Sequence, residues 1–454
     1  MPNSDFPHHV FREYDIRGIA GTDISEQLAY RLGKAYAAML PAGESRPVIV
    51  GRDVRLSGPA LQQALIRGLT DAGLDVLDIG IVPTPLAYYA VYTLNTAGSV
   101  QVTASHNPGD YNGFKMMIGK SSLHGDEIQE IKRLIQQDFP DAEERGHCSQ
   151  SCIIDSYIDF VVNDCPLDYP LKVVIDAGNG PSGTIAAPLY RRLGCEVIEL
   201  YCEPDGNFPN HHPDPTIEEN MVDLAETVVR EKADLGIAFD GDGDRIGIVD
   251  AEGQIIWSDM LLLLLSRHLL KEHPGATIIS EVKCSQHMYD GIIQAGGKPV
   301  MWRTGHSPIK AKMKETGALL AGEMSGHMFF ADRFFGFDDA AYAGARVMQM
   351  LSQCKAGFAD LLTGIPESVA TPELRVDCSD ARKFDLVNEA INHFKASGYE
   401  IIDIDGMRMQ FADGWALLRA SNTQPALVLR FEADTKERLA EIRALIEGWL
   451  LENS

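Results

Sequence analysis

The sequence predicts an α/β protein with three related domains, each built on a mixed, largely parallel sheet, and a C-terminal α+β domain with an antiparallel sheet. Three observations support this prediction. A strand–loop–helix–glycine–strand pattern occurs three times before residue 303, and a different succession of strands lies between two helices after residue 381. The chain also has 454 residues, which is too long for one hydrophobic core and indicates two to four domains.

The repeated pattern has the length of a βαβ unit. Each copy spans about 30 residues, as such units do. Each expected helix ends at a glycine, namely Gly73, Gly194 or Gly296, which is a common helix stop. Three copies at comparable spacing indicate internal repetition with parallel pairing. The expected first strands are 47–51, 172–176 and 276–280, the helices 58–72, 184–193 and one ending near 295, and the second strands 75–79, 196–200 and 299–302.

The C-terminal segment has another pattern. Short strands are enclosed by an earlier helix and a closing amphipathic helix, which predicts a small antiparallel sheet. With this change of pattern, we expect domains at 1–151, 152–254, 255–367 and 368–454. The expected helices are 382–397 and 435–451, and the expected strands are 399–404, 406–411, 415–420 and 426–432.

Composition predicts a cytoplasmic protein that has no membrane partner. Hydrophobic residues make up 45% and charged residues 23% of the chain, as in ordinary globular proteins. Residues 1–12 lack the basic and apolar character of a signal peptide. The longest apolar run, 260–265, is far shorter than the roughly 20 residues that a membrane span needs.

The charge and the cysteines exclude further classes. A net charge of -25 argues against nucleic acid and anionic membranes as partners. An anionic substrate would therefore need arginines and lysines gathered locally. Cys148 and Cys152 have no second pair at zinc-site spacing, so free thiols in a reducing compartment are expected.

The run TASHNP at 103–108 is the first candidate site. It follows the expected strand end 98–102 and places Ser105 on a polar turn, with His106 beside it and Lys115 ten residues later. A serine on such a turn can be reached by a substrate and activated or covalently modified. The alternative is a hydrogen-bonded Ser/Asn/Pro turn without chemistry.

The run DGDGDR at 240–245 is the second candidate site. Asp240, Asp242 and Asp244 alternate with glycines after an apolar strand, so their oxygens can converge on a hard cation such as Mg²⁺. An EF-hand would need glycine and glutamate where Arg245 and Ala251 stand. The alternative, an exposed acidic turn, does not explain the two glycines and the arginine at a strand end.

Two more polar loops follow. In GEMSGH at 322–327, side chains of Glu, Ser and His offer donors and acceptors of the kind that sugar hydroxyls need. In RASNTQP at 419–425, a guanidinium, hydroxyls and backbone N–H groups can form an anion cradle. Either loop could instead be a polar turn, and Arg430 could be a structural ion-pair partner.

Four smaller candidates lie after expected strands or near a terminus, where ligand sites of α/β domains collect. Each alone is more readily explained by structure than by function. They are Tyr14, Arg17, Lys283 and His306.

These four motifs, in this order and over essentially the whole chain, resemble the α-D-phosphohexomutase family. The runs 103–108, 240–245, 322–327 and 419–425 are similar to its phosphoserine, metal, sugar-recognition and phosphate-binding loops. The resemblance implies four domains around a central cleft. Met324 is similar to the residue of bacterial members that act on glucose and mannose phosphates, where phosphoglucosamine mutases usually carry glutamine. Gln424 departs from the Glu or Thr of many relatives, which bears on phosphate affinity.

The resemblance implies a reversible transfer of a phosphoryl group between the 1- and 6-positions of mannose or glucose phosphates. Ser105 would carry the phosphoryl group and, with the three aspartates 240, 242 and 244, bind one Mg²⁺. A hexose 1,6-bisphosphate would form, turn end over end and return its other phosphate to Ser105, so it also serves as activator. His106 is then expected only to position the loop.

The remaining roles also follow from the resemblance. Hexose phosphates are the expected partners, and the chain is expected to be a monomer or weak dimer. The alternatives are a phosphoglucosamine mutase, a hydrolase with a phosphoserine intermediate and a silent sugar-phosphate-binding protein. The further implied catalytic residues are Lys115, Arg245, His306 and His327, and the implied substrate-binding residues are Tyr14, Arg17, Lys283, Glu323, Ser325, Arg419, Ser421, Asn422 and Thr423.

Overall fold

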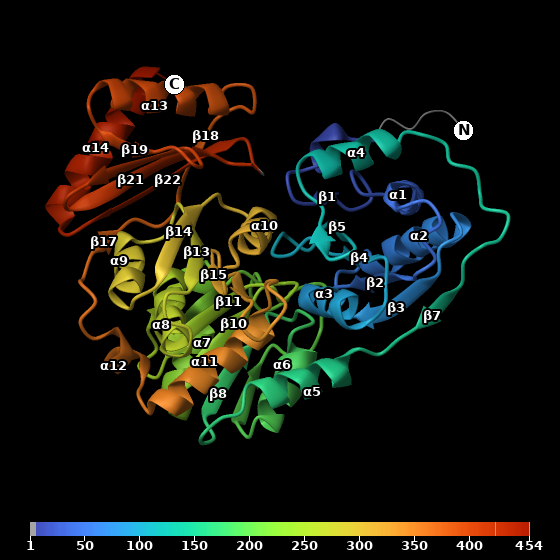
Figure 1. Cartoon of the computed structure of the whole chain (residues 1–454), viewed down its shortest axis with the longest axis horizontal. Coiled ribbons are helices and arrows are strands. Elements are labelled where there is room, and N and C mark those ends of the chain that lie inside the picture. Colours follow the sequence, from blue (N-terminus) through green and yellow to red (C-terminus); the bar gives the residue numbers. More distant parts are fainter. Residues whose placement is uncertain (1–5, 423, 454) are drawn as a thin grey trace. The chain divides into compact units, whose positions relative to one another are not determined.

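The computed structural model describes residues 6–422 and 424–453 (Figure 1). The chain forms two compact units. The first unit holds the residues up to 261 together with Ser325–Leu361, and the second holds Leu262–Met324 and Leu362–Ser454. The first unit contains the seven-stranded and the five-stranded sheet, and the second contains the parallel strands β13, β14 and β15 and the six-stranded sheet.

The first sheet of the first unit is mixed, with the strand order β1-β5-β4-β2-β3-β7 and β6 paired to β5. The central pairs β2/β3 and β2/β4 are parallel, whereas β5 runs antiparallel to both β4 and β1. Helices α1 and α2 pack together, and α3 packs on β2 and β4. The elements are β1 (Ile16–Ile19), α1 (Glu26–Met39), β2 (Val48–Arg52), α2 (Gly58–Asp71), β3 (Val76–Ile81), α3 (Thr84–Thr93), β4 (Gly98–Val102), β5 (Tyr111–Ile118), β6 (Ser121–Ser122), α4 (Asp126–Leu134) and β7 (Cys148–Gln150).

The second sheet of this unit has the order β12-β11-β10-β8-β9. Its β8/β9 and β10/β8 pairs are parallel, and β10/β11 is an antiparallel pair. Helix α6 packs on β8 and β9, α7 on β8 and β10, and α11 on β11. The elements are α5 (Ile154–Asp164), β8 (Lys172–Asp176), α6 (Gly183–Arg192), β9 (Glu196–Leu200), α7 (Val222–Glu231), β10 (Leu235–Phe239), β11 (Ile246–Asp250), β12 (Ile255–Ile256), β16 (Met328–Phe330) and α11 (Ala340–Cys354).

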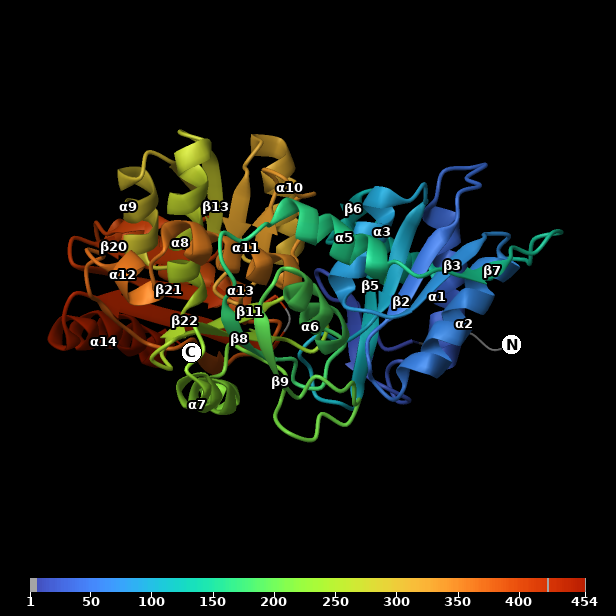
Figure 2. The ribbon, with the colours of Figure 1, turned by 90° about the horizontal axis from the view of Figure 1, so that it is seen from below.

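Aromatic side chains join the two halves of the first unit. Tyr89 of α3 packs edge-on against Tyr157 of α5, with ring centroids 5.3 Å apart. The Tyr157 hydroxyl donates to Asp339, which caps α11. The loops that follow β4 and β10 therefore belong to one compact unit, and Figure 2 shows α3 and α5 close to each other from below.

In the second unit, the parallel strands β14, β13 and β15 lie side by side, with α9 on β14 and α10 on β13 and β15. The C-terminal sheet has the order β17-β22-β21-β20-β19, with β18 on β22, and all its pairs are antiparallel. Helices α13 and α14 pack on β21 over a separate apolar core. The elements are β13 (Thr277–Glu281), α9 (Gln286–Gln294), β14 (Lys298–Trp302), α10 (His306–Thr316), β15 (Leu320–Gly322), β17 (Val369–Ala370), β18 (Leu374–Asp377), α13 (Lys383–Ala396), β19 (Glu400–Ile402), β20 (Met407–Phe411), β21 (Gly414–Ala420), β22 (Ala426–Ala433) and α14 (Lys436–Asn453). Two helices span the division between the units, namely α8 (Ser258–Glu272) and α12 (Phe358–Leu362).

The fold class predicted from the sequence is confirmed. The three repeated units are β2–α2–β3, β8–α6–β9 and β13–α9–β14, and each pair of strands is parallel. Gly73, Gly194 and Gly296 end the three helices with φ of 90°, 96° and 83°, a left-handed conformation that favours glycine. The central cleft and the domain boundaries stay predictions.

The apolar run 260–265 lies inside α8, where Leu261 to Leu265 are all buried in the protein core. Within residues 6–422 and 424–453, none of the helices combines the length and the apolar character that a membrane crossing requires.

Candidate active site

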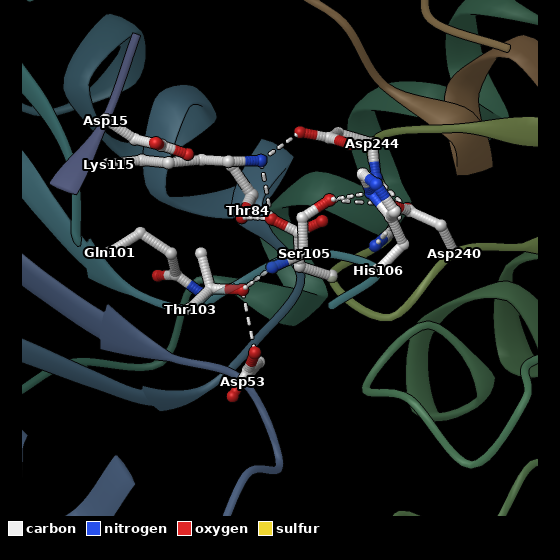
Figure 3. A network of polar contacts seen from close by, with 12 residues as sticks. Asp15, Asp53, Thr84, Gln101, Thr103, Ser105, His106, Lys115, Asp240 and Asp244 are labelled. Atoms are coloured by element: carbon white, nitrogen blue, oxygen red, sulfur yellow. Dashed lines mark hydrogen bonds and ion pairs between the residues drawn. The ribbon is translucent and has the colours of Figure 1, made fainter. Parts of the chain in front are cut away.

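Ser105 lies in the loop between β4 and β5 and is buried. It is 1% exposed, and its φ of 51° is in the left-handed region that non-glycine residues rarely adopt. Its hydroxyl donates to Oδ2 of Asp240 across 2.9 Å and lies 3.1 Å from Nδ1 of His106 (Figure 3). The polar turn expected at Ser105 is present, and the loop folds inward against the aspartates.

His106 is a neutral neighbour of this hydroxyl. Burial lowers the pKa of its imidazole well below the ordinary value, and the positive charges of Arg245 and Arg17 lower it further. Nδ1 of a neutral ring can form a hydrogen bond with Oγ of Ser105, and the loop-positioning role of His106 stays a prediction.

The metal loop follows β10 and brings its three carboxylates together. One oxygen from each of Asp240, Asp242 and Asp244 lies within 4.8 Å of the others, and all three residues are 0% exposed. Oδ1 of Asp240 accepts hydrogen bonds from the backbone N–H groups of residues 243, 244 and 245, at 3.0 to 3.1 Å, which closes the loop.

The two glycines of this loop have steric causes. Gly243 has φ of 76°, and a Cβ there would lie 2.2 Å from Oγ of Ser182. A Cβ at Gly241 would lie 2.5 Å from the carbonyl oxygen of Ser105. The missing side chain at Gly241 therefore lets the metal loop and the serine loop approach each other closely.

Lys115 of β5 balances part of the acidic charge. Its ammonium donates to Oδ2 of Asp242 across 2.7 Å and also to Oδ2 of Asp244 (Figure 3). Burial alone would lower the pKa of Lys115, but the two carboxylates outweigh it and raise that pKa well above the ordinary value. Thr84, at the start of α3, donates its hydroxyl to the same oxygen of Asp242.

The carboxylates differ in their surroundings. Burial, and then the charges of Asp244 and Asp242, raise the pKa of Asp240 well above its ordinary value. Burial acts in the same direction on Asp242, but the Lys115 ammonium and the Thr84 hydroxyl outweigh it and hold that pKa below the ordinary value.

Oδ1 of Asp242 and Oδ1 of Asp244 are buried and have no hydrogen-bond partner among the described residues. Two free buried oxygens in an oxygen-only donor set fit a hard divalent cation.

His327 and Asp338 extend this cluster. Nε of Arg245 donates to Nε2 of His327 across 3.1 Å, so the proton of a neutral ring is on Nδ1. Nδ1 lies 3.0 Å from Oδ2 of Asp338 and 3.6 Å from Oδ1 of Asp244. Asp244, His327 and Asp338 also lie close enough together to hold a metal ion. Because Nε2 of His327 already accepts from Arg245, we interpret the imidazole as a ring held by hydrogen bonds and not as a metal ligand.

Arg17 of β1 connects to the serine loop. Its guanidinium donates to Oδ1 of Asn107 across 2.6 Å and pairs with Asp15. Tyr14 is half-buried two residues before β1. Ser325 is half-buried and is the first residue of the second segment of the first unit, Ser325–Leu361.

In the second unit, the buried carboxylate of Glu281 organises the sugar loop. It accepts hydrogen bonds from the backbone N–H of Lys283 at 2.9 Å, from the Thr304 hydroxyl at 3.0 Å and from the backbone N–H of Met324 at 3.2 Å. Lys283 is 7% exposed and pairs with Glu373 at 3.2 Å. Burial lowers the pKa of Lys283, but the charges of its carboxylate neighbours outweigh this and raise it.

The predicted sugar and phosphate loops are linked within this unit. Glu323 accepts from the backbone N–H of Gly305 across 2.7 Å, directly before His306 opens α10. Asp405 accepts from Nε of Arg419 at 3.1 Å and from the backbone N–H of Thr304 at 3.0 Å.

The hairpin turn between β21 and β22 carries the rest of the phosphate loop. Ser421 accepts from the backbone N–H of Gln424 across 3.1 Å, and Asn422 is half-buried. The Gln424 side chain accepts from Arg375, which adds another cation beside the turn. Thr423 lies outside the described residues. Of the residues predicted for the site, those around Ser105 thus gather in the first unit and those around Arg419 in the second.

Comparisons with known proteins cover the chain from end to end. Family models for the α/β/α domains I, II and III and for the C-terminal domain of phosphoglucomutase/phosphomannomutase match in sequence order. The chain belongs to the phosphoglucomutase/phosphomannomutase family. The matched segments are 8–141, 155–253, 257–369 and 373–448.

Individual members of the phosphoglucomutase/phosphomannomutase family are similar over nearly the full length. The phosphomannomutase/phosphoglucomutase of Pseudomonas aeruginosa is 46% identical over 98% of this chain and 96% of its own. The phosphoglucomutase of Neisseria gonorrhoeae is 45% identical over 97% of each chain. A crystal structure of a phosphoglucomutase/phosphomannomutase family protein from Burkholderia thailandensis has a TM-score of 0.90 and 44% identity, covering 96% of each chain. The predicted family and the predicted class of enzyme, a phosphohexose mutase, are confirmed.

Several residues of the site were missed by sequence reasoning. Thr84, Asp338 and Glu281 contact predicted residues but stand outside the four loops. Thr84 begins α3, Glu281 ends β13 and Asp338 lies two residues before α11, so their positions at the ends of elements are the signal that could have identified them. Asp53 and Arg55, in the loop after β2, were also missed, although ligand sites of α/β domains collect after strands.

Proposed function

We propose that this chain interconverts the 1- and 6-phosphates of glucose and mannose through a phosphorylated Ser105 and a hexose 1,6-bisphosphate. The observation that supports this best is the 2.9 Å hydrogen bond from the Ser105 hydroxyl to Asp240 inside the three-aspartate group. A serine hydroxyl beside a cation-binding group, with Lys115 and Arg245 nearby, can carry a doubly charged phosphoryl group.

The aspartates 240, 242 and 244, with an oxygen on Ser105, would hold one Mg²⁺. This ion would neutralise negative charge at the phosphoryl group when bound. Lys115 and Arg245 add two fixed positive charges on the first unit.

In the forward transfer, the bond between phosphorus and Oγ of Ser105 breaks, and a bond forms to a hydroxyl oxygen of the hexose phosphate. The hydroxyl proton passes to a base, and Oγ of Ser105 recovers a proton when it is free again. His327 is one candidate for this proton transfer. Lys115 and His306 remain candidates for the same step.

The second unit would bind the part of the sugar that does not react. Arg419, Ser421, Asn422 and Thr423 are proposed to hold the distal phosphate, and Glu323 and Lys283 of the same unit would contact the sugar. Ser325, Arg17 and Tyr14 of the first unit are proposed as further substrate contacts, with Ser325 and Glu323 on hydroxyls at positions shared by glucose and mannose. Because a bisphosphate must present either end to Ser105, this binding must accept both orientations.

Further parts of the proposal concern the whole protein. We place the domain boundaries near 151, 254 and 367, close to the gaps between the matched segments. We also propose a cytoplasmic monomer or weak dimer whose partners are hexose phosphates.

Intact-mass measurement tests the central step. After incubation with glucose 1,6-bisphosphate, the wild-type chain should gain about 80 Da, and Ser105→Ala should not. Ser352→Ala removes another buried serine of the first unit and should keep the gain. A wild-type chain that never gains this mass would refute the phosphoserine.

A kinetic comparison tests the substrate. Glucose, mannose and glucosamine 1-phosphates at equal concentration should give turnover with the first two. A large preference for the amino sugar would indicate a phosphoglucosamine mutase, and stoichiometric release of free phosphate without isomer would indicate a hydrolase.

A further inference from the structure

Arg55 is fully buried beneath the serine loop. It stands in the short segment between β2 and α2, and its side chain is 0% exposed. Its guanidinium donates almost entirely to main-chain carbonyl groups of one loop. The acceptors are the carbonyls of Ser105 at 2.6 Å, Asn107 at 2.6 Å, Pro108 at 2.6 Å and Tyr111 at 2.9 Å.

Asp53 ties this guanidinium to the other side of the loop. Oδ2 of Asp53 accepts from Nε of Arg55 at 3.1 Å and from the hydroxyl of Thr103 at 2.7 Å. Oγ1 of Thr103 in turn accepts from the backbone N–H of Ser105 at 2.9 Å (Figure 3). The N–H of Ser105 is therefore bound by Thr103 and its carbonyl by Arg55, and Asp53 links these two side chains.

This double attachment explains the conformation of Ser105. A left-handed φ on a non-glycine residue is unfavourable and persists only where surrounding contacts hold it. Here Thr103 binds the N–H before the strained bond and Arg55 binds the carbonyl after it. The same φ directs the hydroxyl to Asp240.

We propose that Asp53, Arg55 and Thr103 form a loop clamp that positions Ser105 for phosphoryl transfer in both directions. The proposal rests on the proposed function, because it needs Ser105 to carry the phosphoryl group. The three residues act through the main chain of the loop and are positioning residues. Their effect is to keep Oγ at one place relative to the three aspartates while the phosphoryl group arrives and leaves.

The chemistry of the clamp requires arginine. A guanidinium has five N–H donors in a planar fork, and this one spans Asp53 and four carbonyls. A lysine ammonium has three donors at one point and cannot reach this set. Arg55→Lys should therefore keep the charge and lose the positioning.

The first experiment compares kcat and KM for glucose 1-phosphate in the wild type, Arg55→Lys, Thr103→Val and Thr103→Ser. A misplacement of about 1 Å can cost about 100-fold in rate, so we expect kcat to fall at least ten-fold in Arg55→Lys and Thr103→Val. KM should change about two-fold or less, because the distal phosphate residues lie in the second unit. Thr103→Ser restores the hydroxyl and should recover most of the loss seen with valine.

The second experiment uses rescue. Arg55→Ala should regain part of its kcat when millimolar guanidinium is added, because the small cation can refill the buried position. Arg346→Lys is the matched control, since Arg346 is also buried in the first unit and pairs with Asp332 at 2.8 Å, far from the serine loop in sequence. This control should keep wild-type kcat with and without guanidinium.

The phosphorylation assay separates the two proposals. If the wild type never gains about 80 Da from glucose 1,6-bisphosphate, the proposed function fails. If the wild type gains it and Arg55→Lys and Thr103→Val gain it at the wild-type rate with unchanged kcat, the clamp is overturned. Should the Arg55 variants not fold, the Thr103 pair decides: equal kcat in Thr103→Val and Thr103→Ser would overturn the clamp.

Discussion

The Ser105 hydroxyl donates a hydrogen bond to the Asp240 carboxylate across 2.9 Å, although 135 positions separate the two residues in sequence. The contact joins a loop of the first sheet to a loop of the second sheet within one compact unit. It places a nucleophilic hydroxyl beside a group of carboxylates that can bind a cation.

Asp242→Asn should reduce Mg²⁺ binding and nearly abolish turnover. The change removes one negative charge from a group of three and weakens the pairing with Lys115 at 2.7 Å. Isothermal titration with Mg²⁺ and the mutase assay measure both effects. Asp250→Asn is the control, because Asp250 is buried but caps a turn beyond β11. Wild-type Mg²⁺ affinity in Asp242→Asn would exclude this residue from the metal site.

Thr84→Val should lower Mg²⁺ affinity about ten-fold, because residues that orient metal ligands typically contribute 10- to 100-fold. The Thr84 hydroxyl donates to Oδ2 of Asp242, while Oδ1 accepts no hydrogen bond from the described residues and could ligate a cation. Thr84→Ser keeps this hydroxyl and should bind Mg²⁺ nearly as the wild type does. Equal affinities of the valine and serine variants in a Mg²⁺ titration would show that the hydroxyl has no such role.

Asp339 should make the stability of the first unit pH-dependent. Burial raises the pKa of its carboxyl to about 7, while the unfolded chain has about 3.8. Between pH 4 and 7 the folded protein thus holds a proton that the unfolded chain has lost, so the free energy of unfolding falls as pH rises through this window. Above pH 7 the free energy of unfolding has lost this whole contribution, which amounts to ~1.4 kcal/mol for each unit of difference between the folded and unfolded pKa.

Asp339→Asn checks this prediction. Its amide oxygen can still accept the helix-capping hydrogen bond from the backbone N–H of Tyr342, now 2.9 Å long. Urea unfolding at pH 5, 6, 7 and 8 should show a smaller decline for the variant than for the wild type. Parallel declines in both proteins would contradict the raised pKa.

Arg419→Lys should raise KM for hexose phosphates about ten-fold and affect kcat less. A guanidinium binds phosphate through two parallel hydrogen bonds, whereas an ammonium offers only a point charge. Arg419 is also oriented by Asp405 at 3.1 Å, a contact that lysine would lose. Arg438→Lys in the same C-terminal sheet domain alters an arginine paired with Asp413 and should leave KM unchanged. An unchanged KM in Arg419→Lys would remove this residue from the distal phosphate site.

The local elements could be predicted because their signals are local. Apolar runs at β2, β8 and β13 and the glycine stops at Gly73, Gly194 and Gly296 identify the three βαβ units without tertiary information. The acidic loop at 240–245 was likewise identified from spacing, since oxygen ligands that share one cation must lie close together.

The contacts between loops could not be predicted in this way. Arg55 and Asp53 look like an ordinary surface ion pair in sequence, yet both are 0% exposed and bind the serine loop about 50 positions away. The same holds for Glu281, whose three hydrogen bonds reach Lys283, Thr304 and Met324. Hydrophobic periodicity and motif spacing do not predict which loop a buried charged side chain will contact.

The sequence by itself determined the four-part α/β and α+β organisation, the family and the four polar loops, because hydrophobic periodicity and short motifs are properties of contiguous residues. Only the tertiary structure decided that Ser105 is buried, adopts a left-handed conformation and is bound on both sides by Thr103 and Arg55. The reason is physical: a buried donor or acceptor must find a partner, and packing of distant segments selects that partner.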